Sequence, residues 1–219
     1  MKIGCENLGM GGIGFLGRKD WLFLATKTVA RVLLFPFFRI ECEGEETLPS
    51  NSSFVLLPKH QRWEDTPLLG LATPNPLYYV AKHELFSNPL SNWFLRSLGG
   101  IPLNRERPLE SRRSIRAMIE FLRGGEGVVV FPEGTYFRDR VGPGHVGMVR
   151  LILSRLDLPF IPVGINYSRP GFRTLVRVRF GRPFFADPKL SADPFLDRMM
   201  RQIAKLSGLP QDPPRATGQ

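Results

Sequence analysis

The stretch SFVLLPKHQRWEDTPLL, residues 53 to 69, contains the change of pattern that decides the fold. Its first part, SFVLL, is a short continuous apolar run, as expected for a strand that is covered on both faces of a sheet. A polar loop follows, and a helix is expected to open at Thr66 and Pro67, because a short polar side chain caps free amides and proline is favoured in the first turn. A buried strand that leads through a loop into a helix is typical of α/β proteins.

Similar strand patterns recur along the chain. Several are continuously apolar, whereas TLVRVRF alternates apolar and basic residues and is expected to be half exposed, near an edge of the sheet. IPVGINY contains a proline, which argues for an edge or irregular position. The expected strands are RIECEG (39–44), SFVLL (53–57), LYYVA (77–81), GVVVF (127–131), FIPVGI (160–165) and TLVRVRF (174–180).

Helical patterns lie between these strands. In the clearest one, Ile115, Met118, Ile119 and Leu122 recur at spacings of three and four, and arginines occupy the other faces. Such a basic face can contact anionic lipid or an acidic carrier protein, but commonly it only solubilises a helix. A last helix is expected at about 193–207. The fold class that follows is α/β, a single domain with a mixed, mostly buried sheet flanked by helices.

Composition limits the possible binding partners of the protein and indicates its cellular compartment. A chain of 219 residues and 24.8 kDa fits one domain with appendages. Its 30 Lys and Arg against 20 Asp and Glu give a net charge of +10, which favours partners that carry phosphate, namely nucleic acid, anionic lipid or a phosphorylated small molecule. Cys5 and Cys42 are the only cysteines, and neither has a metal-ligand or CxxC spacing. We therefore expect a reducing compartment, with no disulfide framework and no zinc site.

Two segments near the N-terminus invite opposite interpretations. GMGGIG, residues 9–14, formally matches GxGxxG, but no convincing strand precedes it, so residues 1–20 are interpreted as a flexible Gly-rich leader. Residues 21–38 are mainly apolar and aromatic, but Lys27 and Arg31 interrupt them. The longest uncharged run is far shorter than the roughly 20 residues that a membrane-spanning helix needs.

The segment 21–38 is therefore expected to be an amphipathic helix. Asp20 would be its N-cap and Pro36 lies near its end. Several aromatic residues and two cations are typical of a helix that lies in a membrane surface, but a helix packed on the domain core has a compatible composition. Composition alone leaves both interpretations open.

His60 and Asp65 lie five positions apart in the loop after SFVLL. In a structural interpretation, Asp65 caps the helix and His60 is an ordinary loop residue, and chance pairs with this spacing are common enough to require support. In a chemical interpretation, a carboxylate holds one imidazole nitrogen so that the other acts as a general base. The sequence has no GxSxG elbow, no cysteine near His60 and no metal-ligand cluster. A base at His60 would therefore act on the substrate's own hydroxyl or on water.

Three further stretches follow His60 in order. GGIPLNR (99–105) ends in Arg105, whose planar guanidinium suits phosphate binding. FPEGT (131–135) follows the apolar run GVVV and so lies beyond a buried strand, where the active sites of α/β sheets usually lie. IPVGINY (161–167) is the third stretch.

With these four blocks in order over roughly residues 54–167, the chain resembles the glycerophospholipid acyltransferase family that includes the 1-acylglycerol-3-phosphate acyltransferases. The resemblance implies that His60 is the catalytic base and that Asp65 orients it. The third block continues with Tyr136 and Phe137, where many members have Arg and Ser, which leaves the bound head group open. The substrate-binding residues that the resemblance implies are Arg105, Glu133, Gly134, Thr135 and Lys82.

The activity implied by this resemblance is transfer of a fatty acyl group from acyl-CoA or acyl carrier protein to the free hydroxyl of 1-acylglycerol 3-phosphate (lysophosphatidic acid), which gives phosphatidic acid. No metal or other cofactor would be needed. Because a phosphate would repel Glu133, this residue is expected to contact hydroxyl groups or to orient a cation. The alternatives are another acceptor, such as glycerol 3-phosphate or a different lysolipid, and a non-catalytic basic membrane-binding protein. Nucleic acid is not expected as a partner, because no stacking platform or nucleic-acid module is recognisable.

The resemblance also connects the basic charge with the segment 21–38, since both would attach the enzyme to an anionic bilayer. The protein is then expected at the cytoplasmic face of the cell membrane. The expected organisation is a leader at 1–20, a membrane-associating helix at 21–38, an acyltransferase domain at 39–208 and a disordered tail at 209–219.

Overall fold

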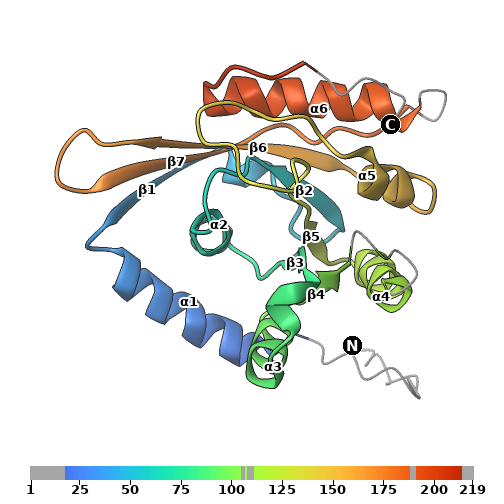
Figure 1. The fold of residues 1–219 in the computed structure, drawn as a ribbon, viewed down its shortest axis with the longest axis horizontal. Helices are drawn as coiled ribbons and strands as arrows, with labels where there is room; N and C mark the ends of the chain where they lie inside the picture. The colour runs from blue at the N-terminus through green and yellow to red at the C-terminus, as the bar shows by residue number, and fades with distance from the viewer. Residues whose placement is uncertain (1–17, 105–106, 108–110, 188–190, 214–219) are drawn as a thin grey trace, which may run out of the picture.

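The computed structural model describes residues 18–104, 107, 111–187 and 191–213. These residues form three layers, with a seven-stranded sheet between two groups of helices (Figure 1). The strand order is β1-β7-β6-β2-β5-β3-β4, and every pair is parallel except β6–β7. The expected α/β fold with a mixed sheet flanked by helices is thereby confirmed.

The strands follow the apolar runs of the sequence closely. They are β1 (Phe38–Glu43), β2 (Phe54–Pro58), β3 (Tyr78–Lys82), β4 (Gly100–Leu103), β5 (Gly127–Val129), β6 (Phe160–Ser168) and β7 (Thr174–Phe180). The helices are α1 (Asp20–Leu34), α2 (Asp65–Ala72), α3 (Pro89–Ser97), α4 (Arg112–Arg123), α5 (Val146–Leu153) and α6 (Ala192–Ser207), and two short 3-10 helices are η1 (Glu45–Thr47) and η2 (His83–Phe86).

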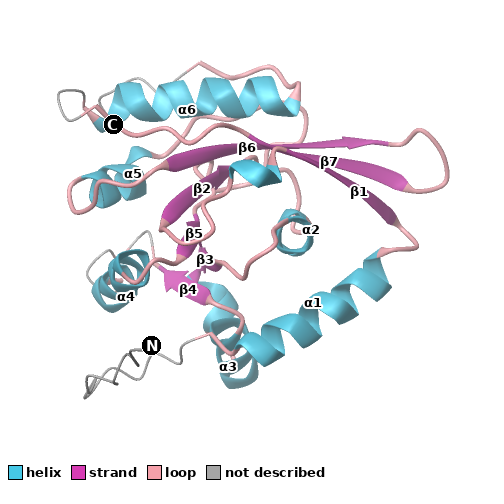
Figure 2. Cartoon of the chain, turned by 180° about the vertical axis from the view of Figure 1, so that it is seen from behind, coloured by secondary structure: helices cyan, strands magenta, loops and turns pink. Residues whose placement is uncertain are grey.

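Each face of the sheet has its own core. Helices α4, α5 and α6 cover one face, where Met118, Ile119 and Leu122 of α4 are buried, as their helical spacing indicates (Figure 2). Helix α2 packs on the other face through Leu68 and Leu69, and α1 lies outside α2 (Figure 1). Successive residues of a strand point to opposite faces, so continuously apolar strands supply both cores.

The positions of two strands test the expectations about sheet edges. β7 lies next to the edge strand β1 and alternates between buried and half-buried residues, as expected. β6, which contains Pro162, lies inside the sheet between β7 and β2, so the expected edge position is wrong. The carbonyl of Pro162 points toward the chain after β7, where it accepts from Gly181 N at 2.8 Å. Proline has no N–H to donate back to the Gly181 carbonyl, and this carbonyl instead accepts from Thr47 Oγ1 at 3.1 Å.

Helix α1 ends at Leu34, earlier than the expected boundary at residue 38. Pro36 cannot continue the helix, and Phe38 already pairs in β1. Asp20 is the first helical residue and not the N-cap, and its carboxylate accepts a hydrogen bond from Arg18 Nε at 2.8 Å. Among the helices of the described ranges, none is both long and apolar enough to cross a bilayer.

The core-packing interpretation of α1 is confirmed for one of its faces, and the interfacial interpretation stays a prediction. Phe23 is buried, and Lys27 Nζ donates to the carbonyl of Thr73 at 2.6 Å, so one face is fixed on α2 and its C-terminal end. The opposite side carries large apolar side chains that are more than half exposed. They are Trp21, Leu24, Val29, Val32 and Leu33.

The expectation of a disordered tail at 209–219 is wrong for its first residues. Val141 N donates to the carbonyl of Pro210, and Asp212 N donates to the carbonyl of Val141, both at 2.8 Å. These backbone bonds form a bridge beside Val141, which is fully buried. Residues 214–219 and residues 1–17 of the expected leader lie outside the described ranges.

Candidate active site

His60 and Asp65 lie in the turn that connects β2 to α2. His60 Nδ1 is 3.1 Å from Asp65 Oδ2, and the same oxygen accepts from the backbone amides of Gln61 at 2.5 Å and Arg62 at 2.7 Å. Asp65 begins α2, so its carboxylate satisfies the amides that precede the helix and draws the turn back onto itself. The expected helix cap at Asp65 is wrong, because Glu64 is the N-cap and no side chain caps α2. The buried carboxylate instead closes the loop and holds the imidazole.

The His60 ring is fixed on its other sides by aromatic residues. It stacks on Phe131 at a centroid distance of 3.9 Å and meets the edge of Tyr136 at 4.5 Å. Because Asp65 already accepts from other donors, it can only be an acceptor toward Nδ1, which places the imidazole proton on Nδ1. Nε2 has no hydrogen-bond partner among the described residues and is left as the basic nitrogen.

Tyr167, in β6, is a site residue that the sequence interpretation missed. Its hydroxyl donates to Asp65 Oδ1 at 2.5 Å, on the oxygen that does not face His60. Burial raises the pKa of Tyr167 well above its ordinary value, and the Asp65 carboxylate raises it further, so the phenol stays protonated and remains a donor. The guanidinium of Arg62 lies over the Tyr167 ring at 4.5 Å. The tyrosine thus fixes the side of Asp65 that lies away from His60.

Glu133 is fully buried and joins the first and third sequence blocks. Its carboxylate contacts Lys59 Nζ at 2.8 and 3.0 Å and accepts from the amides of His60 and Gly142, both at 2.7 Å. Lys59 Nζ also donates to the carbonyls of His60 at 3.0 Å and Phe137 at 2.6 Å. Of the two roles expected for Glu133, this geometry is that of a group that orients a cation. The sequence interpretation did not select Lys59.

Two opposing effects act on this buried pair. Desolvation lowers the pKa of Lys59 and raises the pKa of Glu133, and the attraction between the two charges opposes both shifts. Both side chains have no exposed surface. A pair of this kind orients its surroundings more than it stabilises the fold, since desolvation offsets much of the attraction.

A cavity of about 190 Å3 opens beside His60. It brings together four of the residues singled out in the sequence, His60, Lys82, Gly134 and Thr135. They meet because β2, β3 and β5 run parallel, so the loops that follow these strands lie together at the carboxyl ends of the strands. Gly134 has φ of 69°, a backbone conformation that favours glycine.

Tyr79 also lines this cavity, and the sequence interpretation did not select it. Its hydroxyl is buried and has no hydrogen-bond partner in the described part of the chain. Burial raises the pKa of Tyr79 well above its ordinary value, so the hydroxyl is a donor without an acceptor.

Arg105 lies outside the described residues. The strand before it, β4, pairs in parallel with β3, and Leu103 lies opposite Lys82. The chain that leads to Arg105 therefore leaves the sheet at the edge that carries Lys82. The described residues contain no group of three or more His, Cys, Asp or Glu that could hold a metal ion.

Comparison with known proteins adds to this geometry. The family model described as Acyltransferase matches residues 39–166, more than half of the chain. The chain belongs to this acyltransferase family. The match begins in β1 and ends in β6, and it includes the His60 turn, Lys82 and the loop at Glu133.

Named relatives of this chain are similar over part of their length. A 1-acyl-sn-glycerol-3-phosphate acyltransferase of Bacillus subtilis is 38% identical over 97 residues, which are 44% of this chain and 48% of the relative. The chloroplastic enzyme BAT2 of Brassica napus, with the same activity in its name, is 30% identical over 148 residues, 67% of this chain and 42% of the relative. The chain thus spans about half or less of the length of these relatives.

The fold of this chain has a solved counterpart. The crystal structure of the 1-acyl-sn-glycerophosphate (LPA) acyltransferase PlsC from Thermotoga maritima superposes with a TM-score of 0.63 at 22% sequence identity. The similarity covers 85% of this chain and 80% of that one. The arrangement of sheet and helices is therefore that of a known acyltransferase.

Proposed function

We propose that the protein transfers a fatty acyl group from a thioester donor, acyl-CoA or acyl carrier protein, to the free hydroxyl of 1-acylglycerol 3-phosphate. The observation that carries this proposal is the His60–Asp65 pair at the wall of a cavity that Lys82, Gly134 and Thr135 also line. The names of the relatives support the choice of acceptor.

In the proposed reaction, His60 Nε2 removes the proton of the acceptor hydroxyl as its oxygen attacks the thioester carbonyl carbon. The carbon–sulfur bond then breaks, and the thiolate takes the proton back from the imidazolium. Asp65 stabilises the imidazolium through Nδ1, 3.1 Å away. The acyl group passes directly to the acceptor, so no covalent acyl-enzyme is formed.

The negative charge that develops on the thioester oxygen needs a hydrogen-bond donor. Tyr79 lines the same cavity as His60, and we assign this role to its buried, unpartnered hydroxyl. Arg105 and Lys82 supply positive charge for the acceptor phosphate, because a planar guanidinium can bind phosphate in a bidentate manner. Thr135 contacts the glycerol end, and Glu133 acts through Lys59 on the loop that carries His60.

Attachment to the membrane is part of the proposal. The exposed apolar side of α1 and the net charge of +10 suit a helix that lies in an anionic bilayer surface, where acceptor and product both reside. The cytoplasmic face of the cell membrane is the location that meets these requirements, since thioester donors are cytoplasmic metabolites.

The test is an assay of the purified protein with a panel of acceptors and donors. Lysophosphatidic acid, glycerol 3-phosphate and lysophosphatidylcholine are each offered with acyl-CoA or acyl carrier protein, and the products are identified by mass spectrometry. We expect phosphatidic acid from lysophosphatidic acid. His60→Ala should lower kcat at least about 100-fold, the effect of losing a general base.

His83→Ala is the matched control, because His83 lies in η2, is 44% exposed and pairs with Glu84 rather than with a buried carboxylate. This variant should keep its activity. Residual activity of His60→Ala within about tenfold of the wild type would rule out the base assignment. Vesicle binding without any acyl product would indicate the non-catalytic alternative, and product from a different acceptor would replace the proposed substrate.

A further inference from the structure

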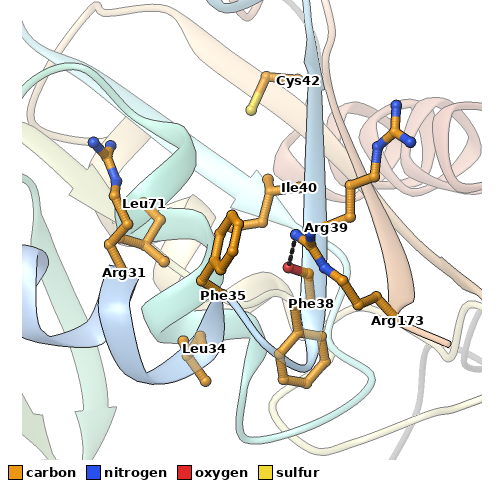
Figure 3. A pocket seen from close by; sticks show the side chains of 9 residues that line it. All are labelled: Arg31, Leu34, Phe35, Phe38, Arg39, Ile40, Cys42, Leu71 and Arg173. Carbon is orange, nitrogen blue, oxygen red and sulfur yellow. Dashed lines mark hydrogen bonds between the residues drawn. The ribbon is translucent and has the colours of Figure 1, made fainter.

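A second cavity lies at the end of α1, away from the catalytic cavity. It has a volume of about 320 Å3 and is enclosed by the last turn of α1, by β1 and by α2 (Figure 3). The two cavities have no lining residue in common. Its apolar wall includes Leu34, Phe38 and Leu71, and Arg31 of α1 and Arg173 of the β6–β7 hairpin join this wall. Arg39 borders the cavity with its backbone, but its guanidinium points away from it, to the other side of β1 (Figure 3).

The positive charges at this cavity are incompletely neutralised. Arg39 has a carboxylate partner, Glu41, at 3.1 Å. Within the described ranges, neither Arg31 nor Arg173 forms an ion pair with a carboxylate. Two cations at one cavity without a carboxylate partner favour binding of an anion there.

Arg173 is held in place but has an open donor. Its Nη2 donates to the carbonyl of Phe38 at 2.8 Å, and the guanidinium lies over the Phe35 ring at 4.4 Å (Figure 3). Its Nε is buried and has no hydrogen-bond partner among the described residues. A buried N–H without an acceptor is uncommon in folded proteins, and an anionic oxygen would complete it.

The surface around this cavity is apolar and aromatic. Thr174 N donates to the carbonyl of Phe37 at 2.8 Å, which joins the β6–β7 hairpin to the turn after α1. Exposed side chains from both segments therefore surround the arginines, with Phe172 of the hairpin 90% exposed. The others are Val32, Leu33, Phe35 and Phe37, each exposed by 63% to 67%.

We propose that the cavity lined by Arg31 and Arg173 binds the phosphate group of an anionic membrane phospholipid. The surrounding apolar side chains, which would be costly to expose to water together, enter the acyl region of the bilayer. A volume of about 320 Å3 is at the lower end for ligand cavities, enough for a head group but not for a whole lipid. The site adds a specific lipid contact to the proposed membrane attachment and rests on it, but it does not depend on acyl transfer.

The test compares two double variants that lose the same charge. Arg31→Gln with Arg173→Gln removes two cations from the cavity. Arg155→Gln with Arg201→Gln removes two exposed arginines on the other side of the sheet, where Arg155 lies just after α5 and Arg201 lies on α6 (Figure 1). Binding is measured by co-sedimentation with vesicles of phosphatidylcholine containing phosphatidylglycerol. We expect the cavity variant to bind roughly 25-fold more weakly, about fivefold for each arginine, and the control to change by less than about threefold.

Equal losses in the two double variants would overturn the proposal, because net charge alone would then explain them. The proposal would also be overturned if the cavity variant lost as much binding to vesicles of pure phosphatidylcholine, which offer no anionic head group. Arg31→Gln alone is included because Arg31 is exposed and its replacement leaves the bond from Arg173 to Phe38 intact. A single variant with wild-type binding to anionic vesicles contradicts the site even if the double variant fails to fold.

A second measurement separates a lipid site from a site for free phosphate. Water-soluble dihexanoyl phosphatidylglycerol and inorganic phosphate are titrated against the wild type and the cavity variant by calorimetry. The short lipid should bind the wild type and lose affinity in the variant, while equal binding of inorganic phosphate would overturn the lipid assignment. All of these experiments are repeated with His60→Ala, so failure of the proposed activity and failure of the lipid site give different results.

Discussion

The hydroxyl of Tyr167 and the carboxylate of Asp65 form a hydrogen bond of 2.5 Å on the side away from His60. Asp65 therefore receives donors on both oxygens, from Tyr167 on Oδ1 and from His60 and two backbone amides on Oδ2. Because the carboxylate is fully buried, its orientation depends on these bonds alone. The position of the imidazole is thus set from β6 as well as from its own loop.

Replacing Tyr167 by Phe should lower kcat about tenfold, because one hydrogen bond to a charged group is lost and Asp65 can rotate. The KM values should remain unchanged, since Tyr167 is placed behind Asp65 and not at the substrate. Steady-state kinetics with both substrates checks this split. Tyr78→Phe is the control, because Tyr78 is buried on the opposite face of the sheet, and it should keep kcat. A changed KM with constant kcat in Tyr167→Phe contradicts the positioning role.

The fold and the His60–Asp65 pair could be predicted from the sequence because their signals are local. Apolar runs mark the strands, and His60 and Asp65 lie within one turn, where spacing alone brings them together. Parallel strands then bring the ends of β2, β3 and β5 to one edge, which explains why Lys82 and Thr135 meet His60.

Contacts between distant segments could not be predicted in this way. Lys59 meets Glu133 across 74 positions, and Tyr167 meets Asp65 across 102 positions, so no local pattern indicates either pair. Pro162 misled the interpretation for a related reason. Its missing N–H faces the Gly181 carbonyl, which accepts from Thr47 Oγ1 instead, and no pattern within the strand indicates this contact.

Replacing Tyr79 by Phe should have opposite effects on stability and activity. The buried hydroxyl has no partner among the described residues, so its removal should raise the free energy of unfolding by up to about 1 kcal/mol. If the hydroxyl donates to the developing oxyanion, kcat should fall at least about tenfold. Chemical denaturation tests the expected rise in the free energy of unfolding, and kinetics on the same preparation test the expected fall in kcat. A stabilised variant with full activity excludes Tyr79 from the reaction.

Replacing Lys59 by Met should destabilise the fold by about 3 to 5 kcal/mol, because Glu133 is left buried without its cation. The loss should depend on pH. Burial already raises the pKa of Glu133 above its ordinary value of 4.5, and removing Lys59 raises it further. A carboxyl with a raised pKa in the folded state contributes stability below its unfolded pKa, and this stability is lost as pH rises through the folded pKa. The free energy of unfolding of Lys59→Met should therefore be closest to that of the wild type at about pH 5 and furthest below it above about pH 7.

The double variant Lys59→Met with Glu133→Gln is the control for this pH dependence. It removes both charges, so the difference in unfolding free energy from the wild type should vary much less between about pH 5 and 8. Urea denaturation at several pH values gives the comparison. If Lys59→Met loses the same free energy at every pH, Glu133 is not an uncompensated charge in that variant.

Replacing Arg105 by Ala should raise the KM for lysophosphatidic acid by roughly 10- to 100-fold, the loss expected for a charge-assisted hydrogen-bonded contact to phosphate. The KM for the thioester should not change. Arg112→Ala, an exposed arginine at the start of α4, is the control. The opposite result, a raised thioester KM with an unchanged acceptor KM, would move Arg105 from the acceptor phosphate to the donor.

Replacing Leu33 and Phe37 by Ser should weaken vesicle binding about 100-fold, because two exposed apolar side chains no longer enter the bilayer. The fold should be unaffected, since both side chains are about two-thirds exposed, at 64% and 65%. High salt separates this effect from that of the arginines. The Debye length falls to about 3 Å at 1 M salt, so attraction by Arg31 and Arg173 is screened while the apolar contribution remains. Phe185→Ser, an equally accessible aromatic after β7, should bind as the wild type does. Loss of binding that disappears at high salt would show that these two side chains do not insert and that α1 is held by charge alone.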